Sequence, residues 1–171
     1  MKTSRVLVAA AVVVAALAVQ LSFLARLPLP GATPDLVLVC VVALGLARGP
    51  GFGLVAGFVA GISTDLAPPA DHAVGRWAFV LSLVGYAAGL ARSETRRSAF
   101  VPVIVVAIAA AASVLMYAAL GLLVDDPAIN WPVVAELLPT AVLYAVVLSP
   151  FVVSAVLAMI HRVEPEPVSR S

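Results

Sequence analysis

The sequence is poor in charged residues and in the side chains that carry most protein chemistry. Of its 171 residues only 11% are charged and 6% aromatic, and it has two histidines and one cysteine. A soluble domain has about 25% charged residues, so this chain lacks the polar surface that such a domain shows to water. A single cysteine excludes an intrachain disulfide and a cysteine-cluster metal site. Because Cys40 lies inside an apolar run, we expect it to be a small buried side chain.

What the sequence has instead is long apolar runs of Ala, Val and Leu. Hydrophobic residues make up 63% of the chain, and the mean hydropathy is +1.15. The runs lack the two-residue alternation of an outer-membrane barrel, and in hydrocarbon the backbone polar groups of a single segment are satisfied by a helix. The sequence therefore predicts an all-α integral membrane protein whose main partner is the lipid bilayer.

Hydropathy and the flanking polar residues predict about six transmembrane helices, at residues 6–25, 35–47, 52–67, 77–91, 100–124 and 133–160. We expect them to form a single membrane domain over residues 1–163, followed by a disordered cytoplasmic tail at residues 164–171. These spans leave no room for a separate soluble domain, which argues against an enzyme. The first apolar stretch is longer than the 7–15 residues or so of a signal-peptide core, and we expect an uncleaved span.

Two of the predicted spans are irregular. Thirteen residues, as in 35–47, reach about 20 Å, whereas the hydrocarbon core is about 30 Å thick. Either Arg48 reaches the interface with its long side chain while Thr33 and Pro34 lie within the interface, or this segment crosses a locally thinned bilayer. A re-entrant pair with 52–67 is the further alternative. Pro139 and Pro150 interrupt the last segment, where we expect a kink or an interfacial first turn around Glu136.

The basic residues predict the orientation. With the N-terminus inside, eight of the ten basic residues fall in inside segments and two, Arg26 and Arg76, fall outside. Cytoplasmic loops carry an excess of Lys and Arg, so we expect both termini in the cytoplasm of a multi-pass plasma-membrane protein. The inside set is Lys2, Arg5, Arg48, Arg92, Arg96, Arg97, Arg162 and Arg170.

Glycine recurs every four residues through the second and third segments. The row contains Gly45, Gly49, Gly53, Gly57 and Gly61. Small residues at this spacing let helix backbones approach closely in lipid. The stripe at 53, 57 and 61 is expected to pack against neighbouring helices of the same chain, with a partner's helix or the lining of a ligand cavity as alternatives.

Prolines and arginine mark the ends of these segments. Pro34 suits the first turn of a helix, and Asp35 beside it complements the positive end of the helix dipole. Arg48, Gly49 and Pro50 predict a tight turn between the second and third segments. Together with Gly53, Gly57, Gly61 and Asp65, these residues are the candidates for helix packing and interaction.

No arrangement of side chains in the sequence predicts catalysis, a cofactor or a metal. Asp35 is expected to start a helix rather than to carry a proton or cation, and Asp65 to make a cap or loop contact, with Arg76 as a candidate partner. Asp71 and His72 on a proline-rich loop are read as solvated residues rather than metal ligands. The serines in the spans have no histidine in a matching position, and the glycines lack the Lys-Ser/Thr of a phosphate-binding loop.

Several motifs follow one another in a distinctive order and spacing: Pro34-Asp35-Leu36, Arg48-Gly49-Pro50, the glycine stripe from Gly53 to Gly61 with Asp65-Leu66, Pro68-Pro69-Ala70-Asp71-His72 and Gly75-Arg76-Trp77. Together they resemble the rod shape-determining protein MreD family, in the form found in actinobacteria. They occupy residues 34 to about 89, while the likeness in length and span pattern covers the whole chain.

The resemblance implies a non-enzymatic member of the cell-elongation machinery, which scaffolds lateral peptidoglycan synthesis and regulates cell shape. Its expected partners are the membrane-anchored MreC, the cytoskeletal MreB and the wall-synthesis polymerase and transpeptidase, with no nucleic acid. The family is also similar in architecture to the substrate-binding subunits of energy-coupling-factor transporters. The alternative function is therefore a small-molecule-binding membrane subunit of a vitamin-type transporter of that class.

Overall fold

The computed structural model describes residues 2–28, 30–67, 74–95, 98, 100–127 and 129–163. Within these residues all regular structure is helical, and the predicted all-α class is confirmed. The elements are α1 (Lys2–Ser22), η1 (Leu24–Arg26), α2 (Leu36–Arg48), α3 (Pro50–Asp65), α4 (Arg76–Leu90), α5 (Arg92–Thr95), α6 (Val101–Leu123) and α7 (Trp131–Val163). The proline-rich loop with Asp71 and His72, the arginines 96 and 97, and the predicted tail at 164–171 lie outside the described residues.

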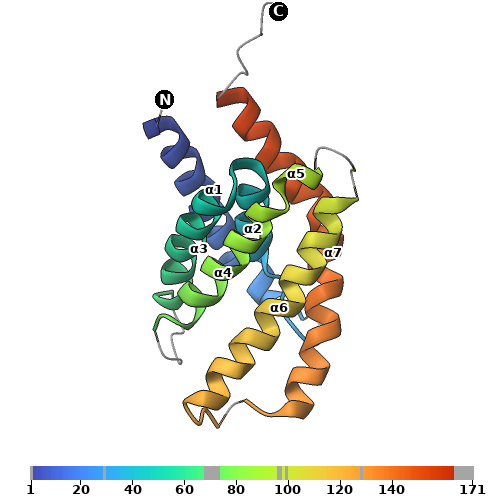
Figure 1. Ribbon diagram of the computed structural model, residues 1–171. Coiled ribbons are helices and arrows are strands. Elements are labelled where there is room, and N and C mark those ends of the chain that lie inside the picture. Colours follow the sequence, from blue (N-terminus) through green and yellow to red (C-terminus); the bar gives the residue numbers. More distant parts are fainter. Residues whose placement is uncertain are drawn as a thin grey trace, which may run out of the picture.

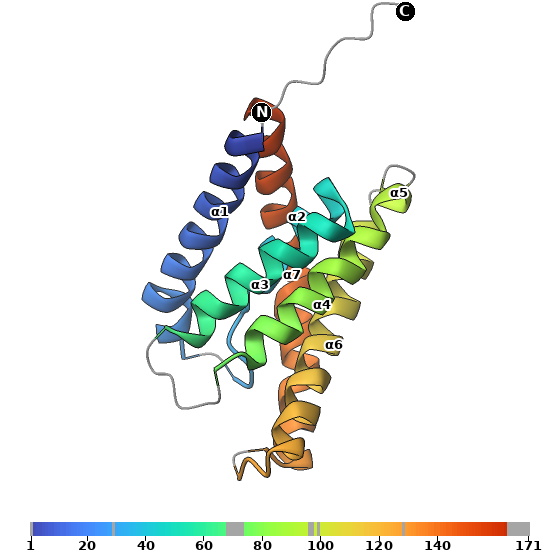
Figure 2. The ribbon, with the colours of Figure 1, turned by 60° about the vertical axis from the view of Figure 1, so that its left-hand side comes forward.

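Among the described residues, two helices are long and apolar enough to cross a membrane, Val101–Leu123 and the segment Trp131–Ile160 of α7. Shorter apolar helices lie at Val6–Ser22, Leu36–Arg48 and Arg76–Leu90. The first turn of α1 and the last turn of α7 lie at the same end of the molecule, and α5 is also at this end (Figures 1 and 2). At the opposite end, the α6–α7 hairpin extends beyond the ends of α3 and α4 (Figure 1).

Helix α2 is the centre of the fold. All ten residues from Val37 to Leu46 are buried, and α2 packs against α1, α3, α4, α6 and α7. A helix that is hydrophobic on every side must be surrounded by other apolar groups, and here protein supplies them. The buried side chain of Cys40 lies in this helix.

Around this core, many large apolar side chains on the outer helices point away from the protein. Exposed examples are Val14 on α1, Phe58 on α3, Ile108 on α6 and Phe151 on α7, each more than half exposed. An apolar exterior of this kind is favourable in lipid and unfavourable in water. The outward-facing apolar side chains of the outer helices therefore fit a lipid surrounding.

Helix α7 runs unbroken through both of its prolines and bends along its path (Figure 1). Its first turn begins at Trp131, where the Asn130 side chain accepts a hydrogen bond from the backbone N–H of Val133 at 3.0 Å. A proline at position 150 cannot donate to the carbonyl of Val146, four residues earlier. The Ser149 hydroxyl donates to that carbonyl at 2.9 Å instead. A neighbouring serine therefore replaces the hydrogen bond that the helix loses, which makes the proline tolerable in an apolar surrounding.

Candidate functional site

The glycine stripe of α3 faces inward, against α4. Gly53, Gly57 and Gly61 are all buried, and a Cβ atom on any of them would collide with backbone atoms of α4, at Gly85, Leu81 and Ala78 respectively. These collisions run in opposite directions along the two helices, so α3 and α4 are antiparallel. The pair forms the most extensive helix contact of the fold. Close backbone approach is therefore the physical reason for the stripe in this structure.

The glycine row continues across the turn from α3 into α2. A Cβ atom on Gly45 would lie 2.6 Å from the carbonyl oxygen of Gly85 and 3.2 Å from the backbone nitrogen of Gly89, and one on Gly53 would lie 3.0 Å from the Cα of Gly45. Helices α2, α3 and α4 thus meet through small residues at one place. The two α4 glycines were not singled out from the sequence, although their own four-residue spacing could have indicated the partner of the stripe.

The turn between α2 and α3 consists of a single residue, Gly49. Its φ of 94° and ψ of 177° are accessible to glycine and strained for other residues. Its N–H donates to the Gly45 carbonyl at 2.7 Å, and Pro50 follows as the first residue of α3. The guanidinium of Arg48 lies 4.9 Å from the ring centre of Phe52, across this turn. Arg48 also lies at the carboxyl end of α2, where a positive charge is favourable for the helix dipole.

Pro34 is buried and directly precedes Asp35, which caps the start of α2. One carboxylate oxygen of Asp35 accepts a hydrogen bond from the backbone N–H of Leu38 at 2.9 Å. A second backbone N–H in the first turn of α2, that of Val37, donates to the side-chain oxygen of Gln20 on α1 at 3.0 Å. Gln20 was not identified from the sequence, and its position as the single amide within a long apolar run was the available signal.

Asp65 ends α3 and caps the start of the following helix α4. Its side chain is fully buried, and its two oxygens accept hydrogen bonds from the backbone N–H groups of Gly75 at 2.8 Å, Trp77 at 3.2 Å and Ala78 at 3.2 Å. The first turn of a helix has N–H groups without partners inside the helix. A negative charge is also favourable at that end. Asp65 therefore joins α3 to α4 at the end opposite the Gly49 turn.

The side chain of Arg76 points towards the α6–α7 connection. Its guanidinium donates to a carboxylate oxygen of Asp126 at 2.9 Å and lies 4.6 Å from the ring centre of Tyr117 on α6. The Tyr117 ring in turn packs on Trp77, with the ring centres 4.8 Å apart. This ion pair ties α4 to the α6–α7 hairpin. Neither Tyr117 nor Asp126 could be assigned to Arg76 from the sequence, because they are more than 40 residues away.

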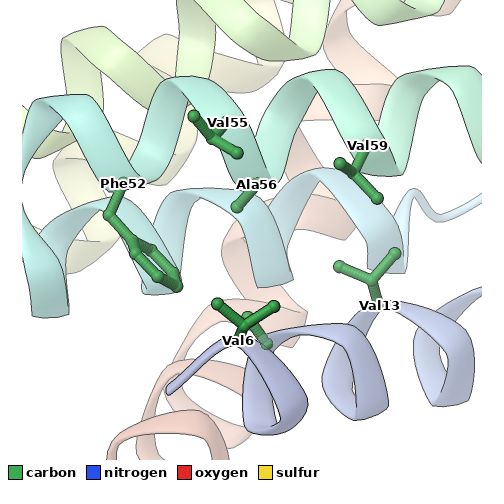
Figure 3. A pocket seen from close by; sticks show the side chains of 7 residues that line it. Val6, Val13, Phe52, Val55, Ala56 and Val59 are labelled. Atoms are coloured by element: carbon green, nitrogen blue, oxygen red, sulfur yellow. The ribbon is translucent and has the colours of Figure 1, made fainter. Parts of the chain in front are cut away.

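Hollows lie between the helices of the described part of the chain. A small groove of about 90 Å³ separates α1 from α3, and its lining is entirely apolar. Figure 3 shows Val6 and Val13 of α1 facing Phe52, Ala56 and Val59 of α3 across this groove. A larger cavity of about 400 Å³ lies near the start of α2, between α6, α7 and the segment that joins α1 to α2.

No group of three or more His, Cys, Asp or Glu side chains comes together within the described part of the chain. The acidic side chains at the two helix ends, Asp35 and Asp65, instead accept backbone hydrogen bonds. The packing glycines, helix caps and outward apolar faces define a helical membrane protein of which the described polar groups serve mainly to join helices.

The chain belongs to the MreD family, since the family model for rod shape-determining protein MreD matches residues 1–161. This family consists of membrane proteins that determine cell shape and is not a known enzyme family. No curated protein and no solved structure matches the chain.

Proposed function

We propose that this protein is a non-enzymatic scaffold of the rod-shape machinery, which holds peptidoglycan-synthesis proteins in place through contacts between membrane helices. The observation that carries the proposal is the family match over residues 1–161. The outward apolar faces of α1, α3, α6 and α7 give such a scaffold surfaces for other membrane helices. The proposed partners are MreC, MreB and the wall-synthesis polymerase and transpeptidase, with no cofactor or nucleic acid required.

The proposed topology has six crossings of the plasma membrane with both termini in the cytoplasm. It is supported by the position of the basic residues, because the turn after Arg48, the short helix that starts at Arg92 and the end of α7 near Arg162 lie at the end where α1 begins (Figures 1 and 2). The likeness of this arrangement to energy-coupling-factor substrate-binding subunits stays a prediction, since no solved structure matches the chain.

Fusions at the carboxyl end test this topology. A green fluorescent protein placed there should fluoresce, and alkaline phosphatase in the same place should be inactive, because the phosphatase folds only outside the cytoplasm. Fusions after Leu66, at the end where Arg76 lies, are the matched control and should give the opposite pair of results. An active phosphatase at the carboxyl end contradicts the proposed orientation.

For the scaffold contact we propose the groove between α1 and α3, with the membrane helix of MreC as its occupant. The glycine stripe is used within the chain by α4, so a partner's helix requires another surface. Phe52 and Val59 point towards α1 (Figure 3), and Val55 also lines the groove. Helices α1 and α3 pack only weakly on one another. The groove between them is therefore available to a third helix.

Disulfide crosslinking tests the contact directly. Since Cys40 is the only cysteine, a Cys40→Ala background accepts Val55→Cys in the groove and Ile108→Cys, on the exposed face of α6, as the matched control. Val55→Cys should crosslink to a cysteine scanned along the MreC helix, with a periodicity of three to four residues, and Ile108→Cys should not. Equal crosslinking from both positions, or none from Val55→Cys while the complex still co-purifies, would place the contact elsewhere. Loss of rod shape on deletion of the gene, restored by the wild-type chain, tests the function itself.

A further inference from the structure

The cavity of about 400 Å³ at the start of α2 has the size and lining of a ligand site. Protein pockets for small molecules have volumes of about 300–1,000 Å³ and combine mostly apolar walls with a few convergent polar groups. Here α6 and α7 supply apolar side chains, including Val114, Val134 and Leu137, and Leu38 of α2 forms part of the wall. Five separate parts of the chain thus surround one space, and no side chain of the described residues fills it.

The polar groups of this cavity are concentrated at the start of α2. Asp35 and Gln20 both line it. The Gln20 side-chain oxygen accepts from the Val37 N–H and one Asp35 oxygen from the Leu38 N–H. The Asp35 carboxylate also has hydrogen bonds to the Gln20 side chain and the Val37 backbone. A carboxylate has two oxygens and about four acceptor positions. Leu38, Val37 and Gln20 take three of those of Asp35, so about one is left for a further donor. None of the described residues that line the cavity is basic. A carboxylate among apolar walls favours a cation or a strong hydrogen-bond donor as its ligand.

The neighbouring wall is aromatic. Trp77 and Tyr117 both line the cavity, with their ring centres 4.8 Å apart. Aromatic faces attract cations and also pack on apolar groups. Arg76 lies against the Tyr117 ring and is held by Asp126, so the basic group nearest to this wall in the described contacts is already engaged outside the cavity lining.

We propose that this cavity binds a small amine-bearing molecule with an apolar body. Its protonated amine donates to Asp35 and Gln20, and its body lies along the Trp77–Tyr117 wall and the apolar side chains of α6 and α7. The amine can come from a lipid headgroup or from a soluble molecule, and both sources share this chemistry. The site is separate from the α1–α3 groove, so the inference does not depend on the proposed scaffold contact.

Tryptophan fluorescence gives a direct measurement. The chain has two tryptophans, and Trp131 is 67% exposed and does not line the cavity. In a Trp131→Phe variant the emission therefore reports Trp77 alone. Two arms distinguish the sources: 2-phenylethylamine is titrated into the protein in phosphatidylglycerol vesicles, and in parallel phosphatidylethanolamine is introduced into the vesicles at increasing mole fraction. The neutral 2-phenylethanol is the matched probe for the soluble arm.

We expect a saturable change in Trp77 emission in at least one arm, and weaker binding of 2-phenylethanol. Asp35→Asn keeps an acceptor for the Leu38 N–H and should preserve the cap, but it should weaken amine binding by about tenfold to a hundredfold, as expected for loss of a charge-assisted hydrogen bond. Ala145→Leu, at a buried lining position, should abolish binding by filling the cavity, whereas Ala10→Leu on the exposed face of α1 should not.

Three results would each overturn the inference. The first is no saturable change in either arm, and the second is equal affinity for the amine and the alcohol. The third is unchanged amine binding in both Asp35→Asn and Ala145→Leu while the circular dichroism of the variants matches that of the wild type.

Discussion

Adding one methyl group at Gly57 should separate α3 from α4. A Cβ atom there would lie 2.9 Å from the backbone nitrogen of Ser82 and closer still to the carbonyl group of Leu81. Both obstacles are backbone atoms of α4, so no side-chain rotation relieves the collision and the helices must move apart. Overpacking of this kind costs about 1–3 kcal/mol. We therefore expect Gly57→Ala to lower the free energy of unfolding by this amount.

The same helix contains its own control. A Cβ atom on Gly51 meets nothing within 4 Å, so Gly51→Ala adds the same methyl group without a collision. Alanine is favoured over glycine inside a helix by about 1 kcal/mol. Gly51→Ala should therefore leave stability unchanged or raise it slightly, and the difference between the two variants isolates the α3–α4 contact.

Thermal unfolding of the purified protein in one detergent, followed by circular dichroism, measures both effects. For a chain of this length each kcal/mol shifts Tm by about 2–4 °C, so Gly57→Ala should unfold roughly 2–12 °C below the wild type. Because no partner protein is present in this measurement, a change in Tm reports packing within the chain. If Gly57→Ala unfolded at the same temperature as Gly51→Ala but lost a partner in cells, the stripe would serve an intermolecular contact and the internal packing argument would be refuted.

The same assay tests three polar contacts. Asp65→Ala should cost about 2–4 kcal/mol because it leaves buried N–H groups of α4 without their acceptor, whereas Asp65→Asn should keep part of that stability; equal loss in both variants would contradict a capping role. Arg76→Met should cost about 1–3 kcal/mol by leaving Asp126 without this ion pair, and an additive loss in the double variant with Asp126→Asn would argue against coupling. Ser149→Ala should cost about 1 kcal/mol by removing the hydroxyl that donates to the Val146 carbonyl. Ser149→Thr keeps a hydroxyl and should retain the stability of the wild type.

Local sequence signals identified the features that depend on local chemistry. The single-residue turn at Gly49 follows from glycine and proline preferences over a few residues, and the four-residue glycine spacing indicates a flat helix face whatever lies opposite. Long apolar runs likewise indicate helices, because a backbone in hydrocarbon has few other ways to satisfy its polar groups. Each of these inferences needs only neighbours in sequence.

The features that sequence reasoning missed join residues far apart in the chain. Gln20 caps α2 from α1, and Asp126 holds Arg76 from a loop 50 residues later. Asp65 was expected to make a cap or loop contact, with Arg76 as a candidate partner. The backbone N–H groups of Gly75, Trp77 and Ala78 that donate to it were not predicted, because the relative placement of α3 and α4 depends on the glycine packing between them. Long-range hydrogen bonds of this kind follow from tertiary packing and leave no periodic signal.

The length of α2 is explained by its neighbours rather than by the thickness of a bilayer. Thirteen residues reach about 20 Å, and the residues from Val37 to Leu46 are covered by protein, so no lipid chain has to match this helix. The outer helices are subject to the opposite constraint: α6 and α7, with 23 and 33 residues, reach about 35 and 50 Å, beyond the roughly 30 Å of hydrocarbon. Helices of this length fit a bilayer by tilting or by extending past the hydrocarbon. Trp131, at one end of the hairpin, is 67% exposed, and tryptophan is favoured at the membrane–water boundary. The short helices α2, α3 and α4 therefore set the packing through their small residues, and the longer α6 and α7 extend past the ends of α3 and α4 (Figure 1).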